Sequence, residues 1–428
     1  MNSIFAYIKK YAAMLAAQEY PPGPAARLIT ETEEGVFGTV KGADLHALTE
    51  KDVEKLPLEV LPKGRQDIRA IVISQTPACQ EWLRRGEALF PSLDDMAQII
   101  GTRAAVIDAR RGLQQAVPQL TRVMRTNAGC FLIIGQAEDG SYLGYTLTVG
   151  RTPYEAIVAM TVLEKSAEVT LLAEKIGRPQ HIAPWECKLM RTIYMKKYSK
   201  SEAKAKAAEA AQAEAGAAEV GTDPAADSSE KCCRGESAPR SPEENLRRQL
   251  VDYGKGLVAS GLVQGTWGNL SVRLDDTYML TTPSGLDYTR LTPADMVKVN
   301  IHTLAYEGDL KPTSEKGLHA SIYQNRPDVS AIIHTHAKYC SVYAAARTDL
   351  PIPSVQEERS VPFGNPVKLA AYALPGTKAL MKNTAAAVGS NWGAIMAGHG
   401  MIVCGKDLET AFRNGQELEA IAQASLKK

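Results

Sequence analysis

Long apolar runs are missing from this chain of 428 residues. No stretch approaches the roughly 18 consecutive apolar residues that a membrane-spanning helix requires. Residues 1–10 are typical of an amphipathic helix rather than of a signal peptide with a cleavage site. We therefore expect a cytoplasmic protein that has no membrane partner.

An excess of charge of one sign is missing too. The chain has 49 basic and 48 acidic residues, which gives a formal net charge of +1. A protein without a net field has no general electrostatic attraction for polyanions. We therefore expect no nucleic acid among its partners.

Regular cysteine spacing is the third absence. The seven cysteines follow neither a disulfide framework nor a zinc-binding pattern, and most of them look like small buried hydrophobic residues. The adjacent pair Cys232-Cys233 lies in a polar stretch, where a redox or metal role stands beside simple exposure as an alternative. Disulfides are therefore not expected to hold the fold together.

Composition divides the chain into three parts. Residues 1–195 alternate helix-like and strand-like segments and predict one α/β unit. Residues 196–242 are rich first in Ala, Glu and Lys and then in Gly, Ser and Pro, which predicts a partly helical and then disordered linker. Residues 243–428 predict a second unit that opens with a helix.

Histidines in the second unit suggest a metal site. His334 and His336 follow two β-branched residues at i and i+2, so in a strand both imidazoles lie on one face and can reach one ion. His399 stands between two glycines, where the backbone can turn sharply, and offers a third ligand. Three histidines leave a fourth position open, as in catalytic zinc sites, although Mn²⁺, Fe²⁺ and Co²⁺ also suit imidazole ligands. The alternative for the first pair alone is an ordinary half-buried strand.

A carboxylate precedes the next predicted helix. Thr313 or Ser314 can cap the helix-like run at residues 316–323, and Glu315 would then fall in its first turn. A carboxylate close to the metal is a candidate general base.

Loops rich in small polar residues accompany this set. Asn269 stands just before a predicted strand, and Ser284-Gly285 forms a turn after the next strand. With Thr313 and Ser314 they offer hydroxyl, amide and backbone N–H donors that can hold a phosphate. Each loop alone is more often an ordinary turn. Beside the metal set, they predict a small phosphorylated or polyhydroxylated substrate.

The first unit repeats segments of the second in the same order. The matching segments are 42–52 with 285–295, 70–79 with 331–340, and 150–156 with 405–411. This common order predicts one fold used twice. Ile73, Gln75 and Gly144 stand where the second unit has its three histidines, so the first unit is a degenerate copy without metal ligands. We expect it to act as a scaffold.

The motifs of the second unit resemble those of the class II aldolase/adducin family. They follow one another over nearly all of residues 244–428 and read Gly-Asn269-Leu-Ser-Val-Arg, Thr-Pro-Ser284-Gly285, Thr313-Ser314-Glu315, His334-Thr-His336 and Gly-His399-Gly. The resemblance implies two tandem three-layer α/β/α domains, each around a largely antiparallel sheet, with a divalent ion, zinc above all, on the three histidines. It also implies a homo-oligomer with sites at domain or subunit interfaces.

The resemblance implies a reaction as well. In the similar aldolases the glutamate that matches Glu315 moves the proton next to the substrate carbonyl, and the residues that match the five loop residues hold the phosphate. The chain would then be a metal-dependent, aldolase-type lyase that cleaves a carbon–carbon bond of a sugar phosphate or a related hydroxy-carbonyl compound through an enediolate.

Alternatives remain within and beyond this class. A decarboxylase, dehydratase or epimerase of a phosphorylated sugar acid could use the same site, although the related epimerases carry aspartate in place of Glu315. A non-catalytic, adducin-like assembly protein is the other alternative. Fuculose-phosphate aldolase has a tyrosine where this chain has Glu357, which is a candidate acid for the aldehyde oxygen or an exposed surface charge.

The degenerate copy predicts one bound divalent ion per chain. One ion is expected because the first unit has no imidazole at the matching positions. Elemental analysis of metal-loaded protein checks this number. Two ions per chain would contradict the alignment of the two units.

Overall fold

The computed structural model describes residues 2–62, 64–196, 241–263 and 267–427. Most of the expected linker, including Cys232-Cys233, lies outside the described residues. The first unit contains seven strands, β1 (Arg27–Thr32), β2 (Gly35–Thr39), β3 (Val53–Leu56), β4 (Ala70–Ser74), β5 (Ala105–Asp108), β6 (Gly129–Gln136) and β7 (Tyr142–Gly150). Its helices are α1 (Asn2–Ala16), α2 (Pro77–Arg85), α3 (Asp94–Ile99), α4 (Leu113–Met124) and α5 (Pro153–Ile176), and residues 184–196 are helical as well.

The second unit contains another seven strands. They are β8 (Gly268–Arg273), β9 (Tyr278–Thr281), β10 (Val297–Asn300), β11 (Ala331–Thr335), β12 (Leu369–Ala370), β13 (Gly393–Met396) and β14 (Gly400–Gly405). Its helices are α7 (Pro242–Ala259), α8 (Lys316–Asn325), α9 (Lys338–Ala346), α10 (Glu357–Ser360), α11 (Lys378–Val388) and α12 (Leu408–Ser425).

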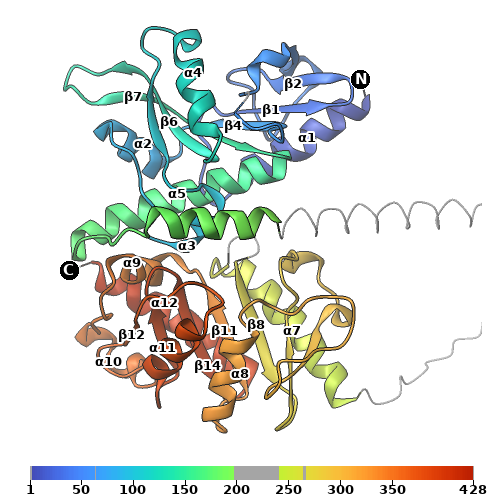
Figure 1. Ribbon diagram of the computed structural model, residues 1–428, viewed down its shortest axis with the longest axis vertical. Coiled ribbons are helices and arrows are strands. Elements are labelled where there is room, and N and C mark those ends of the chain that lie inside the picture. Colours follow the sequence, from blue (N-terminus) through green and yellow to red (C-terminus); the bar gives the residue numbers. More distant parts are fainter. Residues whose placement is uncertain (1, 63, 197–240, 264–266, 428) are drawn as a thin grey trace, which may run out of the picture.

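The two sheets have the same topology. Their strand orders are β3-β2-β1-β4-β7-β6-β5 and β10-β9-β8-β11-β14-β13-β12, so that each strand of the first sheet has a counterpart in the second. Neighbouring strands are antiparallel except for the edge pairs β5–β6 and β12–β13. The fold is therefore α/β with a largely antiparallel sheet, used twice, as the sequence predicts (Figure 1).

Sheet register confirms the sequence pairing of the two units. Gly150 at the end of β7 and Gly405 at the end of β14 hold corresponding places beside β4 and β11. A Cβ atom at Gly150 would lie 2.5 Å from the backbone nitrogen of Ala156, and one at Gly405 would lie 2.3 Å from that of Ala411. Both positions require glycine because the next helix starts against the strand end.

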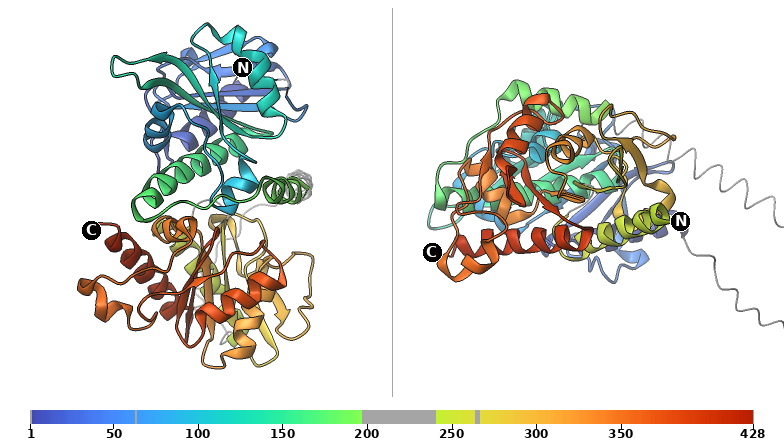
Figure 2. Two further views of the ribbon diagram at one scale, coloured as in Figure 1. Left: turned by 60° about the vertical axis from the view of Figure 1, so that its left-hand side comes forward. Right: turned by 90° about the horizontal axis from the view of Figure 1, so that it is seen from below.

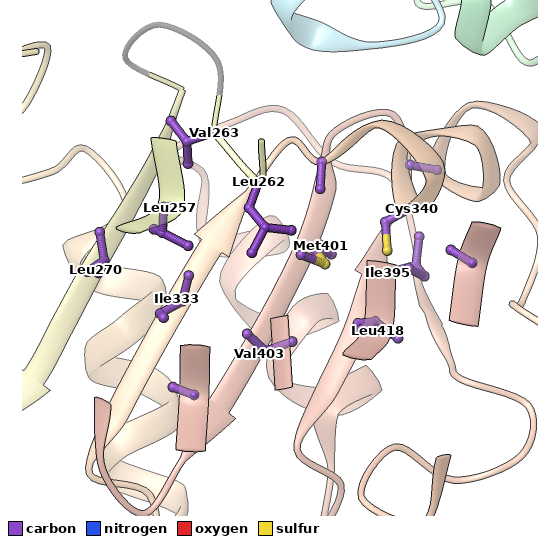
Figure 3. Close-up of a cluster of buried hydrophobic side chains, with 14 of the residues drawn as sticks. Leu257, Leu262, Val263, Leu270, Ile333, Cys340, Ile395, Met401, Val403 and Leu418 are labelled. Atoms are coloured by element: carbon purple, nitrogen blue, oxygen red, sulfur yellow. The ribbon is translucent and has the colours of Figure 1, made fainter. Parts of the chain in front are cut away.

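Helices cover both faces of each sheet. In the second unit Ile333 and Val403 face the core under α7, α9 and α12, which Figure 3 shows in part. Ile332 and Ile402 face the core under α8 and α11, because neighbouring strand residues point to opposite faces. In the first unit α4 covers one face, while α1, α2 and α5 cover the other. Each unit is therefore a three-layer α/β/α structure.

The two units pack tightly on each other. Val169 and Ala173 of α5, with Leu93 just before α3, belong to the same hydrophobic cluster as the core of the second unit. Lys338 at the start of α9 forms an ion pair with Glu168 of α5, with Nζ 3.1 Å from Oε1. Figures 1 and 2 show α3 and α5 between the two sheets. In the described parts of the chain, no helix has both the length and the apolar character that crossing a membrane requires.

A glutamate that is buried in the first unit and half-buried in the second caps the corresponding helix of each unit. Glu164 of α5 accepts hydrogen bonds from the backbone N–H groups of Ala78 and Cys79, at 2.6 and 2.8 Å. Glu419 of α12 accepts from the second and third residues of α9, at 2.7 and 2.9 Å. The first N–H groups of a helix have no partner within the helix, and their positive end favours a carboxylate.

This capping predicts a stability loss for Glu164→Gln. The amide places an N–H₂ group against backbone N–H donors and removes the charge, so we expect the free energy of unfolding to fall by about 2 kcal/mol. Glu174→Gln is the matched control on the same helix. Glu174 pairs with Arg85 near the surface, and its loss should change stability by less than about 0.5 kcal/mol. If denaturant titrations gave the same loss in free energy of unfolding for both variants, the capping hydrogen bonds would contribute no more to stability than a surface ion pair.

Candidate metal centre and active site

Two elements of the second sheet bring three histidines together. His334 lies in β11, between β8 and β14, and His336 follows directly after this strand. His399 lies in the turn between β13 and β14. Gly398 in this turn has a φ of +66°, and a Cβ at Gly400 would lie 2.4 Å from the carbonyl oxygen of Thr335. The glycines on both sides of His399 are therefore needed, as the sequence suggests.

The cluster fits one divalent ion. One nitrogen from each of the three imidazoles lies within 4.8 Å of the others. Nε2 of His334 and Nε2 of His336 are 3.1 Å apart, close to the ~3.3 Å between two nitrogens that bind one tetrahedral zinc. Nδ1 of His334 lies 2.8 Å from the carbonyl oxygen of Met401, which fixes this ring with Nε2 toward the centre.

Glu315 shares this centre. Its Oε1 is 2.9 Å from Nε2 of His399, and its Oε2 is 3.4 Å from Nε2 of His334. Nδ2 of Asn269 donates a hydrogen bond to Oε2 at 2.9 Å, which fixes the orientation of the carboxylate. All four residues are buried.

The start of α8 differs from the prediction. Glu315 is the residue before the helix, with φ −97° and ψ 12°, rather than part of its first turn. Its backbone N–H donates to Oγ1 of Thr313 at 3.2 Å. The chain turns at Glu315, and this turn directs the carboxylate toward the histidines instead of toward the helix.

Burial and neighbouring charges act against each other at the centre. Burial raises the pKa of the Glu315 carboxyl, but His334, His399 and the hydrogen bond from Asn269 bring this pKa well below its usual value. Burial lowers the pKa of His399, but the carboxylates of Asp94 and Glu315 on its two sides raise this pKa well above its usual value. A buried carboxylate is therefore kept ionised beside imidazoles.

The loops expected to hold phosphate lie next to each other. Pro283 and Pro312 form an isolated β-bridge, and the backbone N–H of Ser284 donates to the carbonyl oxygen of Lys311 at 2.9 Å. Thr313 is buried, whereas Ser284 is half-buried and both Gly285 and Ser314 are exposed. Thr313 connects these loops to the metal centre, because its Oγ1 accepts a hydrogen bond from the backbone N–H of Glu315.

Carboxylates of the first unit reach the same histidines. Oδ2 of Asp94 lies 2.7 Å from Nδ1 of His399. Nδ1 of His336 lies 3.8 Å from both Oδ1 of Asp94 and Oδ2 of Asp95. Asp95 in turn forms a buried ion pair with Lys165 of α5, with Nζ 2.7 Å from Oδ2.

Comparison with known proteins places the second unit in a family. Residues 248–426 match the family model described as Class II Aldolase and Adducin N-terminal domain. L-fuculose phosphate aldolase of Escherichia coli K12 is 36% identical over 181 residues, which are 42% of this chain and 82% of the relative. The chain belongs to the class II aldolase and adducin family.

Other members have related activities. The 5-methylthioribulose-1-phosphate/5-deoxyribulose-1-phosphate aldolase of Rhodospirillum rubrum is 38% identical over 178 residues, 42% of this chain and 79% of the relative. A solved structure of L-fuculose 1-phosphate aldolase has 36% identity and a TM-score of 0.40, and the match covers 42% of this chain and 84% of that one. Like the two aldolases matched in sequence, the chain is an aldolase-type lyase.

Two other histidines of this aldolase-type chain lie outside the centre. His319 of α8 is fully buried, with Nδ1 2.6 Å from Oγ of Ser271, and burial lowers its pKa to about 4. His302 is exposed, with Nε2 3.0 Å from the carbonyl oxygen of Asp276. Both are therefore held by contacts of their own.

Glu357 occupies a different place from the other predicted site residues. It is the first residue of α10, and its side chain is exposed. Its role as the acid for the aldehyde oxygen therefore stays a prediction.

Sequence reasoning missed Asp94 and Asp95, because it treated the first unit as a scaffold. The structure adds a correspondence between the units that the sequence repeat did not contain. Leu89, which pairs with Ala104, and Leu350, which pairs with Val367, are corresponding positions in the two units. The acidic pair of α3 thus stands in the segment that carries Glu357 in the second unit.

His336→Ala should abolish ion binding. Two imidazoles cannot hold the ion firmly in an open catalytic site, so we expect less than a tenth of the wild-type content of zinc after dialysis. His302→Ala, which removes an exposed histidine, is the control and should keep the full content. Elemental analysis and circular dichroism check ion content and fold together. Full zinc content in His336→Ala would remove this residue from the ligand set.

Proposed function

We propose that the chain cleaves a carbon–carbon bond of a sugar phosphate or a related phosphorylated hydroxy-carbonyl compound, with zinc on His334, His336 and His399. The observation that carries the proposal is the position of Glu315, a carboxylate on the same centre as three imidazoles. A divalent ion bound there would polarise the carbonyl oxygen next to the bond that breaks.

Glu315 handles the proton on carbon. When the bond breaks, its electron pair stays on the carbon next to the carbonyl, and the other fragment leaves as an aldehyde. In the cleavage direction Glu315 first takes up a proton from solvent and then delivers it to that carbon; in the reverse direction the ionised carboxylate removes this proton. Asn269 holds the carboxylate in one orientation, because its Nδ2 donates a hydrogen bond to Oε2 of Glu315 at 2.9 Å. The proton is therefore delivered at a fixed place.

A second group must take the hydroxyl proton of the aldehyde fragment as the carbon–oxygen double bond forms. Glu357 is the predicted candidate. Its exposed position on α10 fits a residue that meets the substrate from a neighbouring subunit. This agrees with the expected homo-oligomer with sites at domain or subunit interfaces.

Neutral donors are proposed to hold the phosphate. The amide, hydroxyl and backbone N–H groups come from Asn269, Ser284, Gly285, Thr313 and Ser314. The bridge between Pro283 and Pro312 places the loop of Ser284 and Gly285 beside the loop of Thr313 and Ser314. The aldolases similar to this chain are named for phosphorylated sugars, which supports a phosphorylated substrate.

Decarboxylation is the second candidate. The 3-oxo-tetronate 4-phosphate decarboxylase of Escherichia coli O6:H1 is 30% identical over 184 residues, 42% of this chain and 86% of that relative. Loss of carbon dioxide leaves an electron pair next to a carbonyl, as aldol cleavage does, and Glu315 could protonate the same carbon. Dehydration or epimerisation has no comparable observation behind it.

A substrate panel tests the proposed reaction. Metal-loaded protein is incubated with ketose 1-phosphates and with phosphorylated 3-oxo acids, and released aldehyde, dihydroxyacetone phosphate and carbon dioxide are measured. We expect aldehyde from a ketose 1-phosphate. Carbon dioxide alone would favour the decarboxylase, and no product from any compound would contradict the lyase assignment to this substrate class.

Glu315→Gln should reduce turnover at least about a hundredfold, because a positioned proton transfer is lost while shape is kept. We expect the ion to stay on the three histidines. Glu307→Gln, in the exposed loop before Glu315, is the matched control and should keep the wild-type rate. Wild-type turnover in Glu315→Gln would refute the role of this residue as the base. A comparable loss in Glu357→Gln would support that residue as the acid.

A further inference from the structure

We propose that Asp94, a residue of the first unit, is a positioning residue for the metal centre of the second unit, because it orients His399 and His336 from behind. This inference rests on the proposed function, since it requires an ion on the three histidines. It gives the degenerate unit a direct part in building the active site.

Each of the three imidazole rings must be held in the orientation that binds the ion. A histidine that binds an ion through Nε2 carries its proton on Nδ1, and this N–H needs an acceptor that also fixes the ring. His334 finds this acceptor within its own unit, in the carbonyl oxygen of Met401 at 2.8 Å. Oδ2 of Asp94 lies 2.7 Å from Nδ1 of His399 in an ion-pair contact that is not yet a formed hydrogen bond, and Nε2 of this ring lies on the side of Glu315.

His336 completes the pattern. Its Nδ1 lies 3.8 Å from both Oδ1 of Asp94 and Oδ2 of Asp95. The Asp95 oxygen is already paired with Lys165, whereas Nδ1 of His336 and Oδ1 of Asp94 are buried atoms without a hydrogen-bond partner among the described residues. A buried unpaired donor and acceptor cost free energy, so a small rotation that joins them is favourable. Asp94 can then accept from both histidines, one through each oxygen.

Asp94 does not act as a ligand in this arrangement. It faces Nδ1 of His399, whereas the side of the centre is defined by Nε2, which contacts Glu315. A carboxylate behind a ligating histidine fixes the ring and raises the basicity of the bound nitrogen.

The carboxylate is held firmly in place. The backbone N–H of Asp94 donates to the carbonyl oxygen of Gly398 at 2.9 Å, and Nε2 of Gln98 donates to Oδ2 at 3.0 Å. The neighbouring Asp95 is anchored on Lys165 of α5, with both side chains at most 5% exposed. Because α5 packs on α9, the docking of the two units determines where Asp94 lies.

The test uses the full chain and measures ion binding rather than activity alone. Zinc affinity is determined by chelator competition for the wild type, Asp94→Ala, Asp94→Asn and Glu168→Gln. We expect Asp94→Ala to bind zinc about 10–100-fold more weakly, the usual cost of losing such a carboxylate. Asp94→Asn keeps an oxygen acceptor and should lie in between. Glu168→Gln removes an ion pair of the same interface that does not touch the histidines, and should bind as the wild type does.

Cobalt substitution separates positioning from simple loss of stability. The visible absorption of Co²⁺ depends on ligand geometry, so Asp94→Ala should change the band positions or intensities while Glu168→Gln should not. Thermal unfolding monitors the fold of each variant, and Asp94→Asn serves where the alanine variant fails to fold.

Each outcome decides the matter. Wild-type zinc affinity and an unchanged cobalt spectrum in the Asp94 variants would overturn the inference and leave the proposed function intact. A wild-type chain that binds neither zinc nor cobalt would overturn both. An equal loss in Glu168→Gln would assign the effect to docking in general and refute the specific role of Asp94.

Discussion

Buried polar pairing around three imidazoles is the constraint on which the rest of this molecule depends. His334, His399 and Glu315 are nearly inaccessible to water, and burying such groups costs free energy unless polar or charged partners lie beside them. The partners come from a neighbouring strand, from the residue before a helix and from the other unit. The sheet, the turn at His399 and the docking of two domains therefore serve one electrostatic balance.

Much of this arrangement can be predicted from patterns in the sequence. The i, i+2 spacing of His334 and His336, the glycines around His399 and the ordered repeat lead to the fold and the cluster, because strand geometry and close backbone approach are local rules. Asp94 could not be found in this way. Its distance from His399 depends on how two separately folded surfaces meet, and no local pattern encodes that. Glu315 lies directly before α8 rather than in its first turn, and its carboxylate contacts Asn269 and His399, partners that the local sequence does not reveal.

The two units separate what preserves a fold from what performs chemistry. Both have the same strand order, the strand-end glycine and the glutamate that caps the helix after the central strand. Gly144 of the first unit shows the difference, because a Cβ there would lie 1.9 Å from a backbone oxygen, so this place can hold no imidazole. The first unit has no imidazole at these three positions, and two of its carboxylates lie beside the histidines of the second unit.

A centre completed within one polypeptide has a consequence for assembly. When two parts of a site lie on separate subunits, their encounter is bimolecular, and dilution takes the site apart. Here α3 and the histidine turn belong to one chain, so their meeting is governed by an effective concentration that dilution does not change. Because both units belong to one chain, each set of three histidines also has one copy of Asp94 beside it.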